Sequence, residues 1–289
     1  MAIFLGAEDP STISVGQNMT TLNFSLSRAF ARLLVPGYEV LITQLDHEAN
    51  RGPWLSLRSH GVKVREVDLL DNGTLDYEDL KNKVTENTRL VAIGWASNAF
   101  GTVNDIRKVR ELTYRAGAFL LVDAVHYAPH FPVSVQDFGM DFLLCSSYKF
   151  YGPHLGFLYS KPGQLDKLPV DRLSTQEQMA PYSIETGTLN HASLAGVNAA
   201  IAFISSLGEG KSLRDRLATA FQKIGMHEKR LAELLYNEIG SMPNLRIIGP
   251  DFSQDKRAPT ISFVHDVLKP IEICRKLAEN NITAWDGHF

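Results

Sequence analysis

Short, nearly continuous apolar runs alternate along this chain with amphipathic stretches, and this alternation most constrains the fold. Such runs are typical of strands that are buried on both faces of a sheet. They lie at residues 39–43, 89–95, 118–122, 141–145 and 156–159, and residues 62–67 alternate in the manner of a strand. Apolar residues at helical spacing separate them, at residues 23–34, 77–84 and 105–116. Strands that alternate with helices predict an α/β fold with a mostly parallel sheet.

The pattern changes after about Ser206. A long charged amphipathic helix is expected over residues 213–239, and a shorter helix over residues 270–280. Strands are expected at residues 245–249 and 260–264, and another is expected to begin at residues 282–285. We therefore predict a large domain over residues 1–208 and a smaller α+β domain over residues 209–289, the latter incomplete.

Charge and composition exclude several classes of function. The net charge is -3, so no overall field favours nucleic acid or an acidic membrane surface. No run of eighteen apolar residues occurs, so we expect no membrane span. Two cysteines, Cys145 and Cys274, are too few for a disulfide framework and favour a reducing compartment, most simply the cytoplasm.

Polar residues follow several of the expected strands at the point where each ends. In parallel sheets, ligands gather at the carboxyl ends of the strands, so these residues are the first candidates for a site. They are Asp46, His47, Ser97, Asn98, Asp123 and Ser146 to Lys149.

Lys149 and Asp123 have two interpretations each. Lys149 comes directly after an expected buried strand, among hydroxyls and glycine. Burial there would lower the pKa of its amine and favour an imine with an aldehyde. It could equally be a solvated lysine at a strand end. Asp123 ends a buried strand, where a carboxylate needs a partner. A protonated pyridine nitrogen is one such partner, and a helix N-cap is the alternative.

Three further segments are open to both a functional and a structural interpretation. Asn98 could bond a ring hydroxyl or serve a turn, and His47 could stack on a flat aromatic cofactor or start a helix. The segment 16–23 runs into the first long helix, where backbone N–H groups favour a phosphate, with Asn18 and Thr20 as added donors. A plain N-cap explains the same residues. Neither GxGxxG nor GxxxxGK[ST] occurs near it, which argues against dinucleotides and ATP.

Taken together, these segments resemble the class V aminotransferase superfamily of fold type I pyridoxal phosphate enzymes, and within it the cysteine desulfurase-like proteins. The order carries the resemblance: a turn at residues 17–20, Asp46-His47, Asn98, residues 123–126, and Ser146-Ser-Tyr-Lys149 followed by Tyr-Gly-Pro153. It covers about residues 5 to 289. The resemblance implies a three-layer large domain with a mostly parallel sheet and pyridoxal 5'-phosphate as the cofactor.

The resemblance also implies residue roles. Lys149 is similar to the lysine that forms the Schiff base and moves protons at the substrate α-carbon, and Asp123 to the partner of the pyridine nitrogen. His47 resembles the imidazole stacked on the ring, and these three are the expected catalytic residues. Thr188 resembles a threonine that reaches the phosphate of the neighbouring subunit, which implies a homodimer with shared active sites. The other expected cofactor contacts are Asn18, Met19, Thr20, Asn98, His126, Ser146 and Tyr148.

The chain departs from the desulfurase pattern in ways that bear on the reaction. His126 stands where desulfurases usually have Gln, and Tyr148 where they usually have His. The family's persulfide-carrying cysteine would follow a segment similar to residues 284–289, and its carboxylate-binding arginine would also lie beyond that segment. By this comparison the chain looks shortened at both ends.

The resulting hypothesis is a pyridoxal phosphate enzyme that acts on an amino acid, either a desulfurase-like lyase or a class V aminotransferase. The alternative is a catalytically impaired homologue that binds cofactor or partners without turnover. A nicotinamide-dependent dehydrogenase fits the sheet but lacks the glycine fingerprint. The substrate itself stays open.

Overall fold

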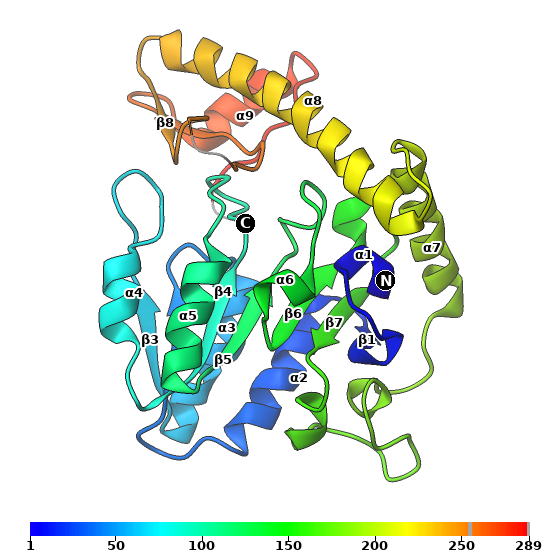
Figure 1. Cartoon of the computed structure of the whole chain (residues 1–289). Coiled ribbons are helices and arrows are strands. Elements are labelled where there is room, and N and C mark those ends of the chain that lie inside the picture. Colours follow the sequence, from blue (N-terminus) through cyan, green and yellow to red (C-terminus); the bar gives the residue numbers. More distant parts are fainter. Residues whose placement is uncertain (254–255, 288–289) are drawn as a thin grey trace.

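The computed structural model describes residues 1–253 and 256–287, which form an α/β unit followed by a smaller C-terminal unit (Figure 1). The central sheet has the strand order β1-β7-β6-β5-β4-β2-β3. Its strands are β1 Ile13–Gly16, β2 Glu39–Thr43, β3 Lys63–Val67, β4 Thr88–Gly94, β5 Phe119–Asp123, β6 Phe142–Ser146 and β7 Gly156–Ser160. Strands β3, β2, β4, β5 and β6 pair in parallel, and β7 is antiparallel to both its neighbours. The predicted mostly parallel sheet is confirmed.

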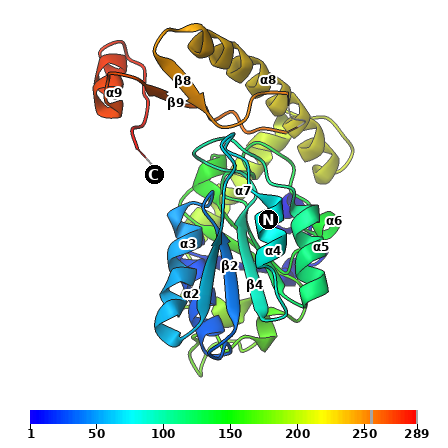
Figure 2. The same ribbon diagram turned by 90° about the vertical axis from the view of Figure 1, so that its left-hand side faces the viewer.

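Helices cover both faces of this sheet and make three layers (Figure 2). One face packs against α2 Met19–Ala31 and α3 Glu48–Leu55. The other face packs against a larger set: α1 Ala2–Leu5, α4 Tyr77–Lys83, α5 Ile106–Ala116, α6 Val135–Phe138 and α7 His191–Ser206. Short 3-10 turns occur at η1 Pro10–Thr12, η2 Ser56–His60, η3 Ser147–Phe150, η4 Leu165–Lys167 and η5 Tyr182–Ile184.

The apolar runs of the sequence divide between two cores, one on each face of the sheet. Successive strand side chains point to opposite faces, so a run that is apolar throughout supplies both. In β5, Leu120 and Val122 belong to one core and Leu121 to the other. In β6, Leu143 and Leu144 divide in the same way. This double burial explains why these strands lack polar alternation, and their parallel pairing brings their carboxyl ends to one edge of the sheet.

The C-terminal unit is built around the long helix α8 Leu213–Ser241, whose first half packs on the large unit. The antiparallel pair β8 Leu245–Ile248 and β9 Ser262–His265 and the helix α9 Pro270–Ala278 follow. Figures 1 and 2 show these elements beyond the edge of the central sheet at which β2, β4, β5 and β6 end.

One element predicted from the sequence is wrong. Residues 282–285 were expected to begin a strand, and the structure has them in irregular conformation. The physical reason is that no neighbouring strand pairs with them in the described part of the chain, and Ile282 and Trp285 are 53% and 71% exposed. His288 and Phe289, the end of the segment that resembles the desulfurases, lie outside the described residues.

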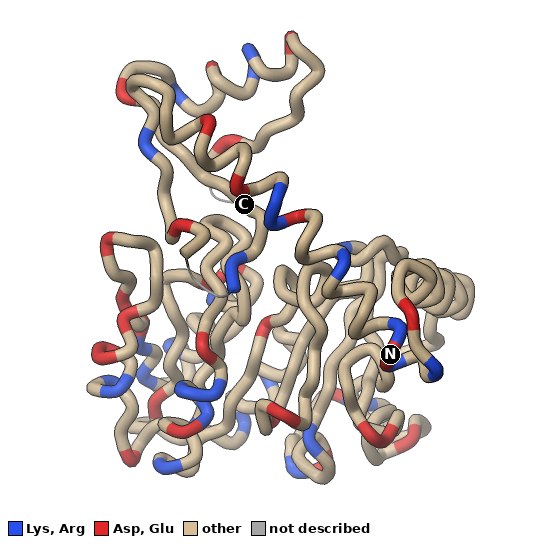
Figure 3. The backbone as a smooth tube through the Cα atoms, turned by 45° about the horizontal axis from the view of Figure 1, so that its top comes forward, with Lys and Arg blue, Asp and Glu red and all other residues tan. Residues whose placement is uncertain are grey.

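Basic and acidic residues are interspersed along the backbone drawn in Figure 3, in keeping with the net charge of -3. Such mixing gives no broad single-sign field. No helix among the described residues combines the length and the apolar character needed to cross a lipid bilayer.

Candidate active site

A pocket opens where β2, β4, β5 and β6 end. Its position follows the rule for ligands in parallel sheets. Its lining comprises Met19, Thr20, Leu45, Asp46, His47, Ala49, Gly94, Ala96, Ser97, Asn98, Asn104, Asp123, Val125, His126, Ser146, Tyr148 and Lys149. Nine of the eleven predicted site residues are therefore together, and Asn18 and Thr188 are outside this lining.

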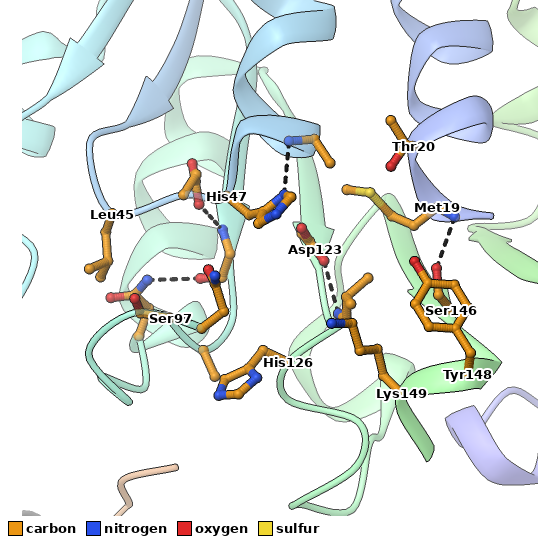
Figure 4. A pocket seen from close by; sticks show the side chains of 17 residues that line it. Met19, Thr20, Leu45, His47, Ser97, Asp123, His126, Ser146, Tyr148 and Lys149 are labelled. Carbon is orange, nitrogen blue, oxygen red and sulfur yellow. Dashed lines mark hydrogen bonds between the residues drawn. The ribbon is translucent and has the colours of Figure 1, made fainter. Parts of the chain in front are cut away.

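Lys149 and Asp123 enter the pocket from adjacent strands. Asp123 is the last residue of β5 and is in register with Leu144 of β6, while Lys149 lies in the 3-10 turn that directly follows β6. Figure 4 shows both side chains directed into the same space. One expectation needs correction: Lys149 is exposed and not buried, because it lies in the turn after β6 and lines the open pocket.

Asp123 is 7% exposed, and its Oδ1 accepts the backbone N–H of Val125 at 2.8 Å. The residues after it form turns and not a helix, so the N-cap interpretation does not hold. Burial raises the pKa of Asp123 to about 6, while the Val125 amide and the charge of Lys149 act in the opposite direction. None of the ion pairs formed among the described residues includes Asp123. A buried carboxyl in this state is stabilised by a cationic ring nitrogen brought into the pocket.

The structure confirms that His47 starts a helix, and the ring also lines the pocket, while its stacking on a cofactor stays a prediction. It is the N-cap of α3, and its Nδ1 accepts the Ala49 N–H at 3.0 Å, so the neutral ring carries its proton on Nε2. Its ring is held in place by this bond and directed into the pocket (Figure 4). Asn98 also lines the pocket, in the loop that follows β4.

The N-terminus of α2 forms one end of the pocket, with Met19 and Thr20 in the lining. The Met19 N–H donates to the Ser146 Oγ at 3.0 Å, which joins this helix end to the end of β6. Asn18 caps the helix through a capping box with Thr21, so its side chain is used locally. A helix N-terminus with adjacent hydroxyls is a favourable environment for a phosphate group.

Gly156 permits this arrangement. A Cβ on Gly156 would lie 2.2 Å from the carbonyl carbon of Asn18 and 2.5 Å from its oxygen, and real Cβ atoms essentially never come so close. The contact is with backbone, so no side-chain rotation relieves it. Glycine at this position therefore lets β7 approach the first turn of α2.

The two departures from the desulfurase pattern, His126 and Tyr148, both line the pocket. Burial lowers the pKa of His126 to about 3, with smaller effects of His130 and Lys149 in the same direction, so the ring is neutral at physiological pH. Tyr148 stacks on His154 with ring centroids 4.7 Å apart. The Lys149 Nζ lies 5.8 Å from the centre of the Tyr148 ring.

Thr188 is exposed in the loop before α7 and does not face this pocket. The role expected of it concerns a neighbouring subunit, and it stays a prediction. Nearby, the Glu185 carboxylate accepts the Val15 N–H at 2.7 Å and so anchors the loop to β1.

Sequence reasoning assigned no role to several buried residues of the pocket, among them Asp46 and Asn104. Asp46 is 2% exposed, and it accepts the backbone N–H groups of Thr43, at 3.0 Å, and of Gly94. Burial raises the pKa of Asp46 to about 7, although these two hydrogen bonds act to lower it, and the charge of Asp123 adds to the rise. Asn104 donates to the Gly94 carbonyl at 2.8 Å. Asp46 could have been identified from the sequence as a polar residue after a strand. Asn104 lies in a loop, and no sequence pattern distinguishes it.

These residues fit pyridoxal phosphate. The pocket provides an amine, a buried carboxyl without an ion-pair partner, an oriented imidazole and a helix N-terminus with a hydroxyl. They do not form a metal site: no group of three or more His, Cys, Asp or Glu able to hold an ion occurs in the described part.

Comparison with known proteins agrees with this geometry. A "Probable cysteine desulfurase" of Halalkalibacterium halodurans is 29% identical over 99% of the chain and 70% of its own length. "Aminotransferase-like protein FGM3" of Gibberella zeae is 34% identical over 96% of the chain and 68% of its own length. The crystal structure of the cysteine desulfurase CsdA from Escherichia coli is 26% identical and superposes with a TM-score of 0.85, over 98% of this chain and 70% of that one.

The chain spans between 41% and 70% of the length of the curated relatives that it matches. The family model described as Aminotransferase class-V matches residues 1–289. This match confirms the predicted fold type and, with it, pyridoxal phosphate as the cofactor of the family. The chain belongs to the class V aminotransferase family.

Proposed function

We propose that this chain is a pyridoxal phosphate-dependent enzyme that acts on the α-carbon of an amino acid, as a desulfurase-like lyase or an aminotransferase. One observation carries the proposal: Lys149 and Asp123 enter one pocket from adjacent strands, close enough for the charge of Lys149 to lower the pKa of Asp123. A single flat ring can lie between an amine and a carboxyl so placed.

Each residue of the pocket would have its own role. Pyridoxal phosphate, when bound, supplies a carbonyl that reacts with amines and a ring that accepts electrons from the substrate α-carbon. Lys149 would hold the cofactor carbonyl and later take and return the proton at that α-carbon. Asp123 would keep the ring nitrogen protonated, and His47, fixed through its Nδ1, would lie against the ring. Met19, Thr20 and Ser146 would hold the phosphate.

An absorbance titration tests the proposal. Added pyridoxal phosphate should give the purified protein a visible absorbance band that persists after gel filtration. Reduction with borohydride should then attach the cofactor covalently to Lys149. Lys149→Ala should abolish the band. The matched control is Lys167→Ala in η4, a lysine outside the pocket, which should leave it unchanged. A wild-type protein that retains no cofactor would refute the assignment.

A panel of amino acids then distinguishes the reactions. Alanine formed from cysteine, with the sulfur released as sulfide when dithiothreitol is added as the reductant, would identify a desulfurase. A keto acid together with a change in the cofactor band would identify an aminotransferase. Relatives with both kinds of name match the chain, so both remain under test. A band that no amino acid alters would identify a cofactor-binding protein without turnover.

We further infer a homodimer that shares its sites through Thr188, a cytoplasmic location, and a domain boundary at residues 208–209. The exposed loop position of Thr188 and the two free cysteines support the first two inferences. The start of α8 at Leu213 supports the third. Sedimentation of the wild type and the cofactor affinity of Thr188→Ala test the shared dimer. Cell fractionation tests the location, and limited proteolysis tests the domain boundary.

A further inference from the structure

The segment that leads into β9, residues 257–262, crosses the loop that carries Asn98; we call it the linking segment. The Ala258 N–H donates to the Gly101 carbonyl at 2.8 Å, and the Ser262 hydroxyl donates to the Ala99 carbonyl. A Cβ on Gly101 would lie 2.6 Å from the Ala258 carbonyl oxygen, so glycine allows this close approach. The C-terminal unit thus contacts a wall of the pocket through backbone.

His126 makes a side-chain contact to the same segment. Its Nε2 lies 2.9 Å from the Oγ1 of Thr260, and its ring lines the pocket. His130 packs edge-on against it with ring centroids 5.1 Å apart. The Nδ1 of His130 lies 3.0 Å from a carboxylate oxygen of Glu228 on α8. Both histidines come from the segment after β5, and both partners come from the C-terminal unit.

We propose that Thr260 and the His130–Glu228 pair are positioning residues that hold the His126 ring in one orientation at the pocket wall, and that they thereby couple the docking of the linking segment to cofactor binding. This rests on the proposed function. A neutral imidazole has one donor and one acceptor, so a bond to one nitrogen decides what the other presents. Coupling of this kind is reciprocal, so bound cofactor should also stabilise the linking segment.

The test replaces the Thr260 hydroxyl. Thr260→Val keeps the shape and removes the bond, Thr260→Ser keeps the hydroxyl, and Glu228→Gln weakens the support of His130. Loss of one neutral hydrogen bond corresponds to roughly a 3- to 10-fold change in an equilibrium constant. We expect the Kd for pyridoxal phosphate to rise by about that factor in Thr260→Val, to rise less in Glu228→Gln, and to stay within about twofold in Thr260→Ser.

A second readout needs no cofactor. In protein labelled with 15N-histidine, the ring resonances of His126, assigned by His126→Gln, should move in Thr260→Val and not in Thr260→Ser. Unmoved resonances, or an unchanged Kd in Thr260→Val, would overturn the inference, as would equal weakening by the serine and valine variants. If the wild type binds no pyridoxal phosphate, the proposed function fails, and the ring resonances still decide whether Thr260 positions His126.

Discussion

Replacing Asp123 by asparagine should change how stability depends on pH in the cofactor-free protein. Burial raises the pKa of Asp123 from 3.8 to about 6, so the folded state holds this proton more tightly than the unfolded chain does. A raised folded-state pKa contributes stability that is fully present below pH 3.8 and is lost as pH rises through about 6. Asparagine does not titrate and keeps the oxygen that accepts the Val125 N–H.

The magnitude follows from the shift. A rise of about two pKa units corresponds to roughly 3 kcal/mol, at about 1.4 kcal/mol per unit. Urea unfolding of both proteins measures this difference. Between pH 4 and pH 7, the unfolding free energy of Asp123→Asn should rise by about 3 kcal/mol relative to that of the wild type. The other ionisable groups largely cancel in this difference, except Asp46, whose pKa Asp123 raises.

The charge of Lys149 supplies the control. Because that charge lowers the pKa of Asp123, Lys149→Ala should move the loss of stability to higher pH. Saturating pyridoxal phosphate should reduce the loss in the wild type, because a protonated ring nitrogen favours ionised Asp123. A difference between wild type and Asp123→Asn that is flat from pH 4 to pH 7 would refute the reasoning.

Three further substitutions test the frame of the pocket. Gly156→Ala should lower the unfolding free energy by about 3 kcal/mol and weaken cofactor binding, because its Cβ meets Asn18 backbone; urea unfolding and the absorbance titration measure both. Ser146→Ala should lower the unfolding free energy by about 1–2 kcal/mol, since the Met19 N–H loses its acceptor, and thermal unfolding checks this. Gly94→Ala places a Cβ 2.9 Å from the Asp46 Oδ1, and it should weaken cofactor affinity more than stability when both are titrated.

Most of the central sheet was predictable because its inner strands are apolar on both faces and bounded by turns, and β3 alternates in the manner of a strand. Strands β2 to β7 were expected within one or two residues of their observed bounds. The sequence reasoning missed β1, which is only four residues long, and α3, whose eight residues include Pro53. It also missed α7, in which small residues blur the helical spacing. The expected strand at residues 282–285 fails because a strand needs a partner that local pattern does not reveal.

The site was predictable to the extent that its residues follow strands. Lys149, His47 and Asn98 follow strands and Asp123 ends one, and a parallel sheet brings such positions to one edge. The contact of His126 with Thr260 could not be predicted, because 134 residues separate the two along the chain. Exposure of Lys149 depends on the course of one short turn, which local pattern does not determine either.

The charges of the pocket lead to one more conclusion about how an anionic group is held. Lys149 is the one Lys or Arg among the residues that line it, and Asp46 and Asp123 are its carboxyls. Since Lys149 is assigned to the carbonyl of the cofactor, the negative charge of a phosphate must be met by other groups. Backbone N–H groups at the start of α2 and the Ser146 hydroxyl are such groups. These donors carry no net charge, so how well they bind a phosphate depends on their positions. We therefore expect phosphate affinity in this chain to depend on how closely β7 approaches α2, an approach that Gly156 allows.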